Sequence, residues 1–318
     1  MRAYQITTAG TDPGFVDLPE PRPQAGEVLI RIRAVGLNFA DTLMIRGTYQ
    51  DIPEPPFTLG MEAAGDVIET GANVDSFSPG DRVCVFGGQG GLAETGAFPA
   101  DRVVKIPDAM SYEHAAAFQI AYGTSHVALK GLAHLAPGET LLVTGAAGGV
   151  GLTAVEIGAL LGARVIAQAR GPEKLAIARA AGADILIDGE EDLRQRLKDL
   201  GGADVVYDTV GGDVFRAAFR ATNPGGRLLP IGFAGGDVPQ IPANHLLVKN
   251  LTVIGFYIGG YMKFRPQIIR DSLEELTRWY LDGRLAPHVS NVLPLDEVAA
   301  GLDLLRTRKA TGKVVILP

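Results

Sequence analysis

A glycine-rich segment near the middle of the chain has the residue types and spacing of an anion-binding turn. It follows an apolar stretch, Leu141–Val143, and precedes an Ala/Leu-rich stretch, 150–161. We interpret these as a buried strand and a helix, so that free N–H groups at the start of the helix face the turn. Glycines here allow a tight turn, a close approach of backbone to a pyrophosphate, and close packing of helix and strand. The predicted pyrophosphate-binding residues are Gly145, Ala146, Ala147, Gly148, Gly149, Val150 and Gly151.

The next strand and helix bear on which dinucleotide fits this turn. We predict a strand at 164–167 and a helix that begins at Pro172 and ends at Gly182. NAD sites usually place an acidic residue about 20 residues after the glycines, where this chain has Gln168-Ala-Arg170. No carboxylate there repels a 2′-phosphate, and Arg170 and Lys174 are close enough to receive one, which favours NADP(H). The alternative is that both cations are ordinary surface charges.

The predicted secondary structure around this turn divides the chain into regions with different patterns. Before residue 118, alternating or apolar stretches separated by Gly/Pro turns predict a mostly antiparallel β domain, with strands at 27–35, 62–69, 82–86 and 101–105. A helical stretch at 111–129 then leads into alternating strands and helices, typical of an α/β parallel sheet, with later strands at 204–209, 226–231 and 251–257. Helices at 268–281 and 296–306 and a strand at 312–317 follow, and we expect this tail to complete the first domain.

Length and composition exclude several classes of protein. A chain of 318 residues suits two domains, and a net charge of −7 argues against nucleic acid or an anionic membrane as the main partner. The single cysteine, Cys84, forms no internal disulfide, and the first residues lack an apolar signal region, so we expect a cytoplasmic protein. Residues 141–163 are apolar, but their glycines and Glu156 favour a buried segment over a membrane span.

A series of short motifs carries a family resemblance. They are Gly36-Leu-Asn-Phe-Ala-Asp41, Gly60-Met-Glu-Ala-Ala-Gly65, Ser78-Pro-Gly-Asp-Arg-Val83, Ala115-Ala-Ala-Phe118, the glycine turn, and Gly312-Lys313. In this order they resemble the medium-chain dehydrogenase/reductase superfamily, and most closely its zinc-free quinone oxidoreductase branch. The resemblance covers essentially the whole chain. It implies an α/β fold: a Rossmann doubly wound parallel sheet plus a GroES-like, mostly antiparallel β domain.

The resemblance also implies the bounds and the roles of the two domains. The GroES-like catalytic domain is expected at 1–118 and 262–318, and the Rossmann NADP(H)-binding domain at 119–261, with an active-site cleft between them. Relatives are commonly dimers, so we expect a homodimer. The segment Gly255-Phe-Tyr-Ile-Gly-Gly-Tyr261 is interpreted either as part of the acceptor pocket or as an edge strand of that dimer.

Departures from the zinc-dependent relatives predict that no metal is bound. Those proteins have Cys where Asn38 stands, His where Met61 stands, and a third ligand near 115–118, which here is Ala-Ala-Ala-Phe. Amide and thioether groups are poor ligands for zinc, which needs three nitrogen, sulfur or carboxylate donors at a catalytic site. The five histidines have no ligand-like spacing. We therefore expect no zinc and an acceptor that takes up hydride without a Lewis acid.

The resemblance implies roles for further residues. Asn38 and Tyr49 face the nicotinamide pocket in the family, so Asn38 is expected to donate its amide N–H to the acceptor oxygen. Tyr49 is expected to hydrogen-bond or protonate the acceptor, unless it is only a turn aromatic. Related quinone reductases have another Tyr where Leu43 stands, and Asp41 is expected to orient the turn that carries Asn38. The further cofactor-binding residues implied are Thr124 near the nicotinamide, Lys313 near the pyrophosphate, and Gly211, Gly232 and Phe233 along the other edge of the cofactor.

The predicted function is NADPH-dependent, metal-free transfer of hydride to a small-molecule acceptor, a quinone. An enoyl-thioester or alkenal reductase is the main alternative, because zinc-free relatives share the motifs and differ in the shape of the pocket. A non-enzymatic NADPH-binding or structural protein is a further alternative. The glycine turn also fits short-chain dehydrogenases, but none of the eight tyrosines is followed four residues later by the Lys that they require.

Overall fold

The segment with the clearest alternating pattern forms the central strand of a large sheet. In the computed structural model, which describes residues 1–318, this strand is β3 (Glu27–Gly36). Ile30, Ile32 and Ala34 are almost completely buried, whereas Arg31 and Arg33 between them are exposed, as expected for a strand with one face on a core. β3 pairs with β5 (Glu62–Thr70), β7 (Thr95–Pro99) and β16 (Lys313–Leu317), each antiparallel. The C-terminal strand of the expected tail therefore pairs with the sheet of the first domain.

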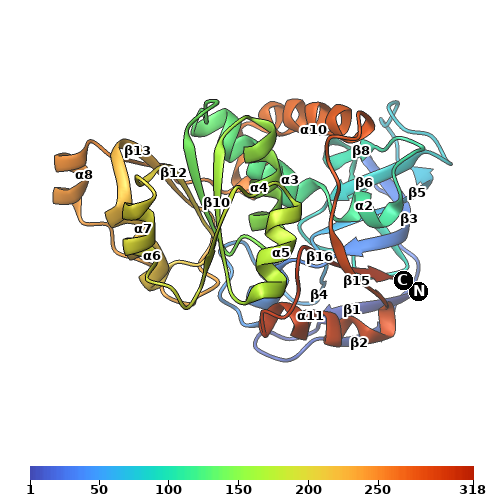
Figure 1. Cartoon of the computed structure of the whole chain (residues 1–318). Helices are drawn as coiled ribbons and strands as arrows, with labels where there is room; N and C mark the ends of the chain where they lie inside the picture. The colour runs from blue at the N-terminus through green and yellow to red at the C-terminus, as the bar shows by residue number, and fades with distance from the viewer. The chain divides into compact units, whose positions relative to one another are not determined.

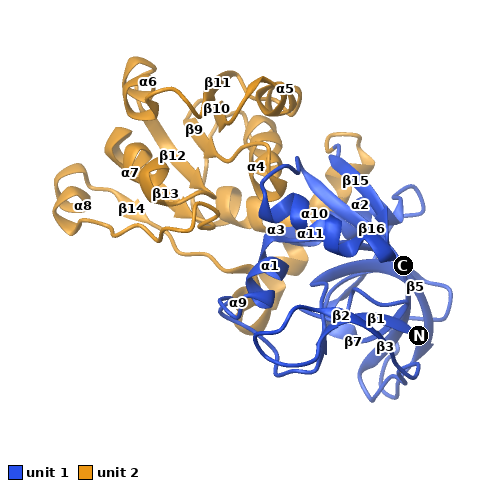
Figure 2. Cartoon of the chain, turned by 90° about the horizontal axis from the view of Figure 1, so that it is seen from below, with its two compact units in different colours: residues 1–120, 286–318 blue, residues 121–285 orange.

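The chain divides into two compact units, coloured separately in Figure 2. Unit 1 comprises residues 1–120 and 286–318, and unit 2 comprises residues 121–285. Unit 1 is built on a seven-stranded sheet of order β15-β16-β3-β5-β6-β8, with β7 also on β3, and a three-stranded sheet of order β2-β1-β4. All these pairs are antiparallel except β15 with β16, so the predicted mostly antiparallel sheet is confirmed.

The bounds of the remaining unit 1 elements are as follows. The strands are β1 (Arg2–Ile6), β2 (Gly14–Asp17), β4 (Phe57–Thr58), β6 (Arg82–Phe86), β8 (Val103–Lys105) and β15 (Val289–Pro294). The helices are α1 (Phe39–Ile45), α2 (Tyr112–Ala116) and α11 (Val298–Arg306), with short 3₁₀ turns η1 (Ala100–Arg102) and η3 (Leu295–Glu297).

Unit 2 contains a six-stranded parallel sheet of order β11-β10-β9-β12-β13-β14. Numbered from β9, this order is 3-2-1-4-5-6, the arrangement of a doubly wound dinucleotide-binding sheet, and the direction of winding reverses between β9 and β12. The strands are β9 (Thr140–Thr144), β10 (Arg164–Ala169), β11 (Ile185–Asp188), β12 (Ala203–Asp208), β13 (Thr222–Pro230) and β14 (Thr252–Val253). The prediction of a parallel α/β sheet is confirmed.

Helices cover both faces of this sheet. In Figure 1, α4 (Gly149–Leu160) and α5 (Pro172–Ala180) lie on one side of β10 and β12, and α6 (Leu193–Asp199) and α7 (Gly212–Ala221) lie on the other. Alternate strand residues follow these two faces: Leu142 and Ile166 pack in one core cluster with Phe215 of α7, whereas Leu141 and Val165 lie close to Gly158 of α4. The remaining helices are α3 (Gln119–His126), the π-helix η2 (Val127–Leu132), α8 (Ala243–Lys249), α9 (Ile258–Phe264) and α10 (Pro266–Leu281). No helix of the protein combines the length and the apolar character required to span a membrane.

Several segments differ from the sequence-based expectations. The strand expected at 101–105 begins only at Val103, after the 3₁₀ turn η1. The strand expected at 251–257 is wrong beyond Val253, because β14 lies at the sheet edge with β13 as its one partner, and the aromatic segment that follows turns into α9. The helix expected at 111–129 is interrupted at residues 117–118 and continues as α3 and η2. The second boundary expected at residue 262 also differs from that of the compact units, since α10 packs on α9 and η2 within unit 2.

Candidate active site

The glycine turn of unit 2 has the close packing that its sequence predicts. Gly145 has a φ of +60°, which favours glycine. A Cβ on Gly151 would lie 2.3 Å from the carbonyl oxygen of Gly145, so α4 approaches the turn as closely as it does because residue 151 has no side chain. Gly148 is the N-cap of α4, which leaves the first N–H groups of the helix at the turn. These features fit a cradle for a pyrophosphate.

The end of β10 carries the residues expected to select the cofactor. Gln168 is buried, and its Oε1 accepts the N–H of Gly145 at 3.4 Å, while Arg170 is exposed just beyond the strand. The neighbouring strand, β11, ends at Asp188. The carboxylate of Asp188 accepts the backbone N–H groups of Gly171 and Glu190 at 3.0 and 3.1 Å. Lys174 lies half-buried in the first turn of α5. The end of β10 and the start of α5 therefore carry two cations, Arg170 and Lys174, and the amide of Gln168. These are the positions where Rossmann folds bind the ribose of the cofactor.

A buried carboxylate that sequence reasoning missed joins the loops after β9 and β12. Asp208 is fully buried, and burial raises the pKa of its carboxyl group. It accepts the hydroxyl of Thr144 and the N–H of Gly211, the latter at 2.8 Å. Thr209 Oγ1 in turn donates to the carbonyl of Thr144 at 2.9 Å. These bonds hold the two loops together where the winding of the sheet reverses, the usual place for a ligand in such sheets.

The structure places the other predicted cofactor residues of unit 2 as follows. Gly211 has a φ of +77° and is the N-cap of α7. Gly232 follows β13 and donates its N–H to the carbonyl of Asp208 at 3.3 Å, and the neighbouring Phe233 is 40% exposed. Thr124 is buried in α3. Their contacts with a cofactor remain predictions.

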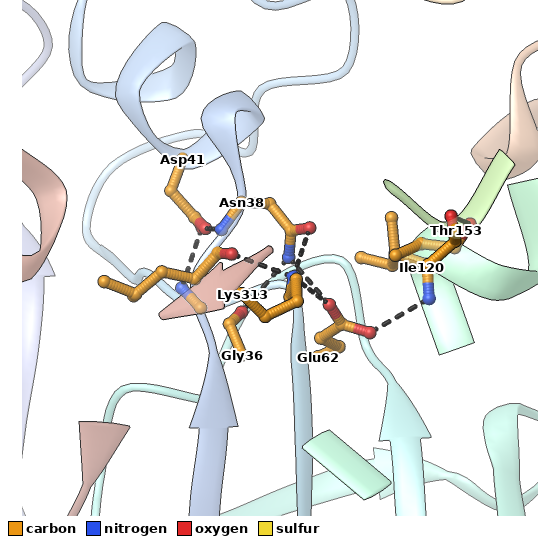
Figure 3. A network of polar contacts seen from close by, with 10 residues as sticks. Gly36, Asn38, Asp41, Glu62, Ile120, Thr153 and Lys313 are labelled. Carbon is orange, nitrogen blue, oxygen red and sulfur yellow. Dashed lines mark hydrogen bonds and ion pairs between the residues drawn. The ribbon is translucent and has the colours of Figure 1, made fainter. Parts of the chain in front are cut away.

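In unit 1, Asn38 lies at the N-terminus of α1 in a network of polar contacts (Figure 3). Its Nδ2 donates to Gly36 O at 3.1 Å and to Glu62 Oε1 at 3.0 Å, and its Oδ1 accepts from Lys313 Nζ at 2.8 Å. Both amide protons are thus used within the protein, so donation to an acceptor requires one of them to be shared or released. The backbone N–H of Asn38 donates to Asp41 Oδ2 at 2.8 Å, which gives Asp41 the orienting role expected of it.

Lys313 and Glu62 form a buried ion pair at the centre of this network. The Nζ–Oε1 distance is 2.7 Å, and the side chains are 7% and 1% exposed. Lys313 Nζ also donates to Leu37 O at 2.8 Å, and Glu62 Oε2 accepts the N–H of Ile120 at 2.9 Å. The ammonium therefore has no N–H left for a phosphate in this arrangement, and its place near the pyrophosphate remains a prediction. The sequence signals for this pair are the Met-Glu motif at 61–62 and the Lys after Gly312.

The remaining predicted residues of unit 1 are placed as follows. Tyr49 is half-buried in the bend that follows α1, and Leu43 lies on α1 itself. Met61, where zinc-dependent relatives have His, is buried. The structure contains no group of three or more His, Cys, Asp or Glu side chains arranged to hold a metal ion. Cys84 is buried, and burial raises the pKa of its thiol to about 12, so it is not a thiolate at neutral pH.

Both halves of the chain match known families. Residues 24–108 match the alcohol dehydrogenase GroES-like domain, and residues 149–277 match the zinc-binding dehydrogenase family. The chain is 43% identical over 297 residues to the quinone oxidoreductase-like protein 2 homolog of Nematostella vectensis, covering 91% of this chain and 81% of that protein.

Solved structures agree with these matches. The quinone oxidoreductase of Thermus thermophilus, whose structures include a complex with NADPH, is 37% identical, with a TM-score of 0.88 and full coverage of both chains. The enoyl reductase CurK is 27% identical, with a TM-score of 0.89 and coverage of 99% and 98%. These relatives share the combination of a GroES-like domain and a parallel dinucleotide-binding sheet described above. The chain therefore belongs to the quinone oxidoreductase branch of the medium-chain dehydrogenase/reductase superfamily.

Proposed function

We propose that this member of the oxidoreductase family uses NADPH to reduce a quinone without a metal ion. The observation that carries this proposal is the glycine turn, in which a side chain on Gly151 would meet the backbone of Gly145 at 2.3 Å. Such a turn, beside the point where the winding of a parallel sheet reverses, fits a dinucleotide pyrophosphate. The Thermus structure is that of a quinone oxidoreductase, and the Nematostella relative is named quinone oxidoreductase-like.

The preference for NADPH is supported by the residues at the end of β10. Gln168 stands where a carboxylate would bind ribose hydroxyls and repel a 2′-phosphate. Arg170 is exposed beyond the strand, and Lys174 is on the first turn of the helix that follows. Guanidinium and ammonium groups bind phosphate through charge-assisted hydrogen bonds. The complex of the Thermus enzyme with NADPH supports the same cofactor.

The donor set around Asn38 supports chemistry without zinc. The side chain at position 38 is an amide and that at position 61 a buried thioether, and neither is a favourable ligand for zinc. The oxygens of Asn38 and Glu62 instead surround the Lys313 ammonium. The positive charge at this position is therefore supplied by the Lys313 side chain.

NADPH, when bound, supplies a hydride. A quinone delocalises the incoming electron pair over its ring, so that one proton completes the hydroquinone. We assign Asn38 to orient the acceptor oxygen through its amide, and Tyr49 Oη to supply or relay the proton. Thr124, Gly211, Gly232 and Phe233 are assigned to the cofactor.

Reduction of an activated alkene is the second candidate. It is favoured by the structural likeness to the enoyl reductase CurK and by Leu43, which stands where related quinone reductases have Tyr. The same amide at position 38 can orient the carbonyl oxygen of an enone or enoyl thioester. The two candidates therefore differ in the acceptor and not in the cofactor.

Both candidates are tested by following NADPH oxidation against parallel panels of quinones, enals and enoyl-CoAs, with EDTA present. Turnover with quinones alone supports the proposal, and turnover with enoyl-CoAs alone supports the second candidate. Loss of activity on metal chelation contradicts metal-free chemistry. Tight NADPH binding with no turnover in any panel contradicts an enzymatic role and favours a binding protein.

We also propose that the protein is a homodimer that pairs through the β14 side of unit 2. β14 is an edge strand, and α8, which precedes it in the chain, leaves Leu247 and Val248 78% and 75% exposed. Exposed apolar side chains beside a free strand edge are typical of an interface. Light scattering is expected to give twice the monomer mass, and the double variant Leu247→Glu, Val248→Glu is expected to give a monomer. The cytoplasmic location also remains a prediction.

A further inference from the structure

The hydrogen bonds of Lys313 use all three of its ammonium protons. They go to Leu37 O, Asn38 Oδ1 and Glu62 Oε1, at 2.8, 2.8 and 2.7 Å. The ammonium and the carboxylate are both almost completely buried. In such surroundings charges interact more strongly than in water, and an unpaired partner is costly. The cation is therefore held at a fixed point beside the amide oxygen of Asn38.

The same contacts fix which way round the Asn38 amide points. Its Nδ2 faces two acceptors, Glu62 Oε1 and Gly36 O, and its Oδ1 faces a donor, Lys313 Nζ. A flipped amide would set Oδ1 against a carboxylate and a carbonyl, and Nδ2 against an ammonium. Every hydrogen bond of the side chain would then be replaced by a repulsion.

A cation bonded to an amide oxygen also changes the amide nitrogen. The positive charge draws electron density toward Oδ1, so the protons on Nδ2 become stronger donors, as in any polarised chain of hydrogen bonds. One of these protons is directed to an anion, Glu62, and the other to a neutral carbonyl, Gly36 O, at the longer distance of 3.1 Å. The second proton is the one that can be shared with the oxygen of an incoming acceptor.

We propose that Lys313 and Glu62 are positioning residues that orient and polarise the Asn38 amide, so that the buried ammonium stabilises the reduced acceptor oxygen through Asn38. This inference rests on the proposed function, in which Asn38 contacts the acceptor. It assigns to Lys313 a task different from binding the pyrophosphate. It also explains why the chain places a full positive charge, and not a neutral donor, behind the amide.

The test uses the double variant Lys313→Met, Glu62→Gln, which removes both charges of the ion pair and retains similar volumes. Thermal unfolding and circular dichroism establish that it folds. Benzoquinone reduction gives kcat and KM, fluorescence titration gives the Kd of NADPH, and ¹⁵N labelling of asparagine gives the side-chain amide shifts of Asn38 in the ligand-free protein. The Asn38 signals are assigned from the Asn38→Asp variant.

The expected result is a kcat reduced about 10- to 100-fold, with the KM for benzoquinone and the Kd of NADPH within about twofold of the parent values. The Asn38 Nδ2 protons should shift upfield as their polarisation is lost. An unchanged kcat together with unchanged amide shifts overturns the inference. A Kd of NADPH raised about tenfold with kcat unchanged also overturns it, because that pattern belongs to a cation on the pyrophosphate.

Two controls keep the outcomes distinct. Lys313→Arg retains the charge and should retain the downfield Nδ2 shift and most of kcat, and loss of that shift overturns the inference even if the double variant does not fold. If the parent protein reduces no acceptor, the proposed function fails. The amide shifts of the ligand-free proteins then decide alone whether Lys313 and Glu62 orient and polarise Asn38.

Discussion

The carboxylate of Asp41 is completely buried and accepts the backbone N–H of Asn38 at 2.8 Å. It also accepts the N–H of Gly60 at 3.3 Å. Burial is the largest influence on this group and raises its pKa to about 6, although both hydrogen bonds and the nearby Lys313 act in the opposite direction. Asp41 thus secures the turn that presents the Asn38 side chain, at the cost of burying a charge at neutral pH.

This relationship predicts how stability depends on pH. Because the pKa of Asp41 is higher in the folded protein than its ordinary value of 3.8, protonation favours the folded state. The contribution of Asp41 is therefore fully present below about pH 4 and is lost as the pH rises through 6, a difference of up to about 3 kcal/mol. Urea unfolding of the parent and of Asp41→Asn between pH 4 and 7 should show the parent gaining on the variant as the pH falls. Parallel curves would exclude the assignment.

Local patterns in the sequence were sufficient to predict individual elements of both units. The alternation in β3, Pro172 at the start of α5 and the glycine spacing at 145–151 each report a backbone constraint within a few residues. The structure confirms these elements. The strand at β14 is shorter than predicted. It lies at a sheet edge with one partner, which an apolar run in the sequence does not reveal.

The polar network of unit 1 could not be predicted in the same way. Lys313 and Glu62 are 251 positions apart in the chain, and no local pattern records that two charged side chains will be buried together. Family resemblance pointed to Asn38 as a donor, but not to the fact that both amide protons are already used. The Asp208 contacts with Thr144 and Gly211 likewise depend on two strands meeting at the sheet centre.

The glycine turn allows steric and ligand effects to be separated with two substitutions. In Gly151→Ala, the new Cβ would lie 2.3 Å from a backbone oxygen that cannot rotate away, so we expect a loss of about 1–3 kcal/mol in stability and weaker NADPH binding. In Gly148→Ala, the φ is −79° and the nearest atom is 3.4 Å away, so the fold should be unaffected. Calorimetric titration with NADPH should still detect a loss for Gly148→Ala, since its Cβ would meet the pyrophosphate. Parent-like affinity would show that the backbone there does not approach the ligand.

The cations after β10 should matter for one cofactor and not for the other. The double variant Arg170→Ala, Lys174→Ala is expected to weaken NADPH binding by about 100-fold or more, since each of the two lost charge-assisted bonds to phosphate costs about 1.5 kcal/mol or more. Binding of NADH, which lacks the 2′-phosphate, should change little. Arg164→Ala is the matched control, because Arg164 lies at the opposite end of the same strand. Equal losses for both nucleotides would refute the assignment.

The buried His126 predicts acid sensitivity in unit 2. Its Nδ1 lies 2.8 Å from Ser272 Oγ, and its ring packs edge-on against Trp279. Burial lowers the pKa of His126 to about 4, and the Lys130 ammonium acts in the same direction, whereas Glu275, with Oε2 at 3.4 Å from Nε2, opposes both. The neutral imidazole is therefore the form that the fold accommodates.

Since the pKa of His126 is lower in the folded than in the unfolded protein, its contribution to stability is complete above about pH 6.5 and is lost as the pH falls toward 4, by up to about 3 kcal/mol. This trend is opposite in sign to that of Asp41, so the two are separated by measuring each variant against the parent. His126→Gln retains a polar partner for Ser272 and removes the titration, and its unfolding free energy should lose less than that of the parent between pH 7 and 4.5. NMR titration of the imidazole gives an independent value. A His126 pKa near 6.5 in the folded protein would contradict the prediction, because it would mean that the charged ring is tolerated between α3 and α10.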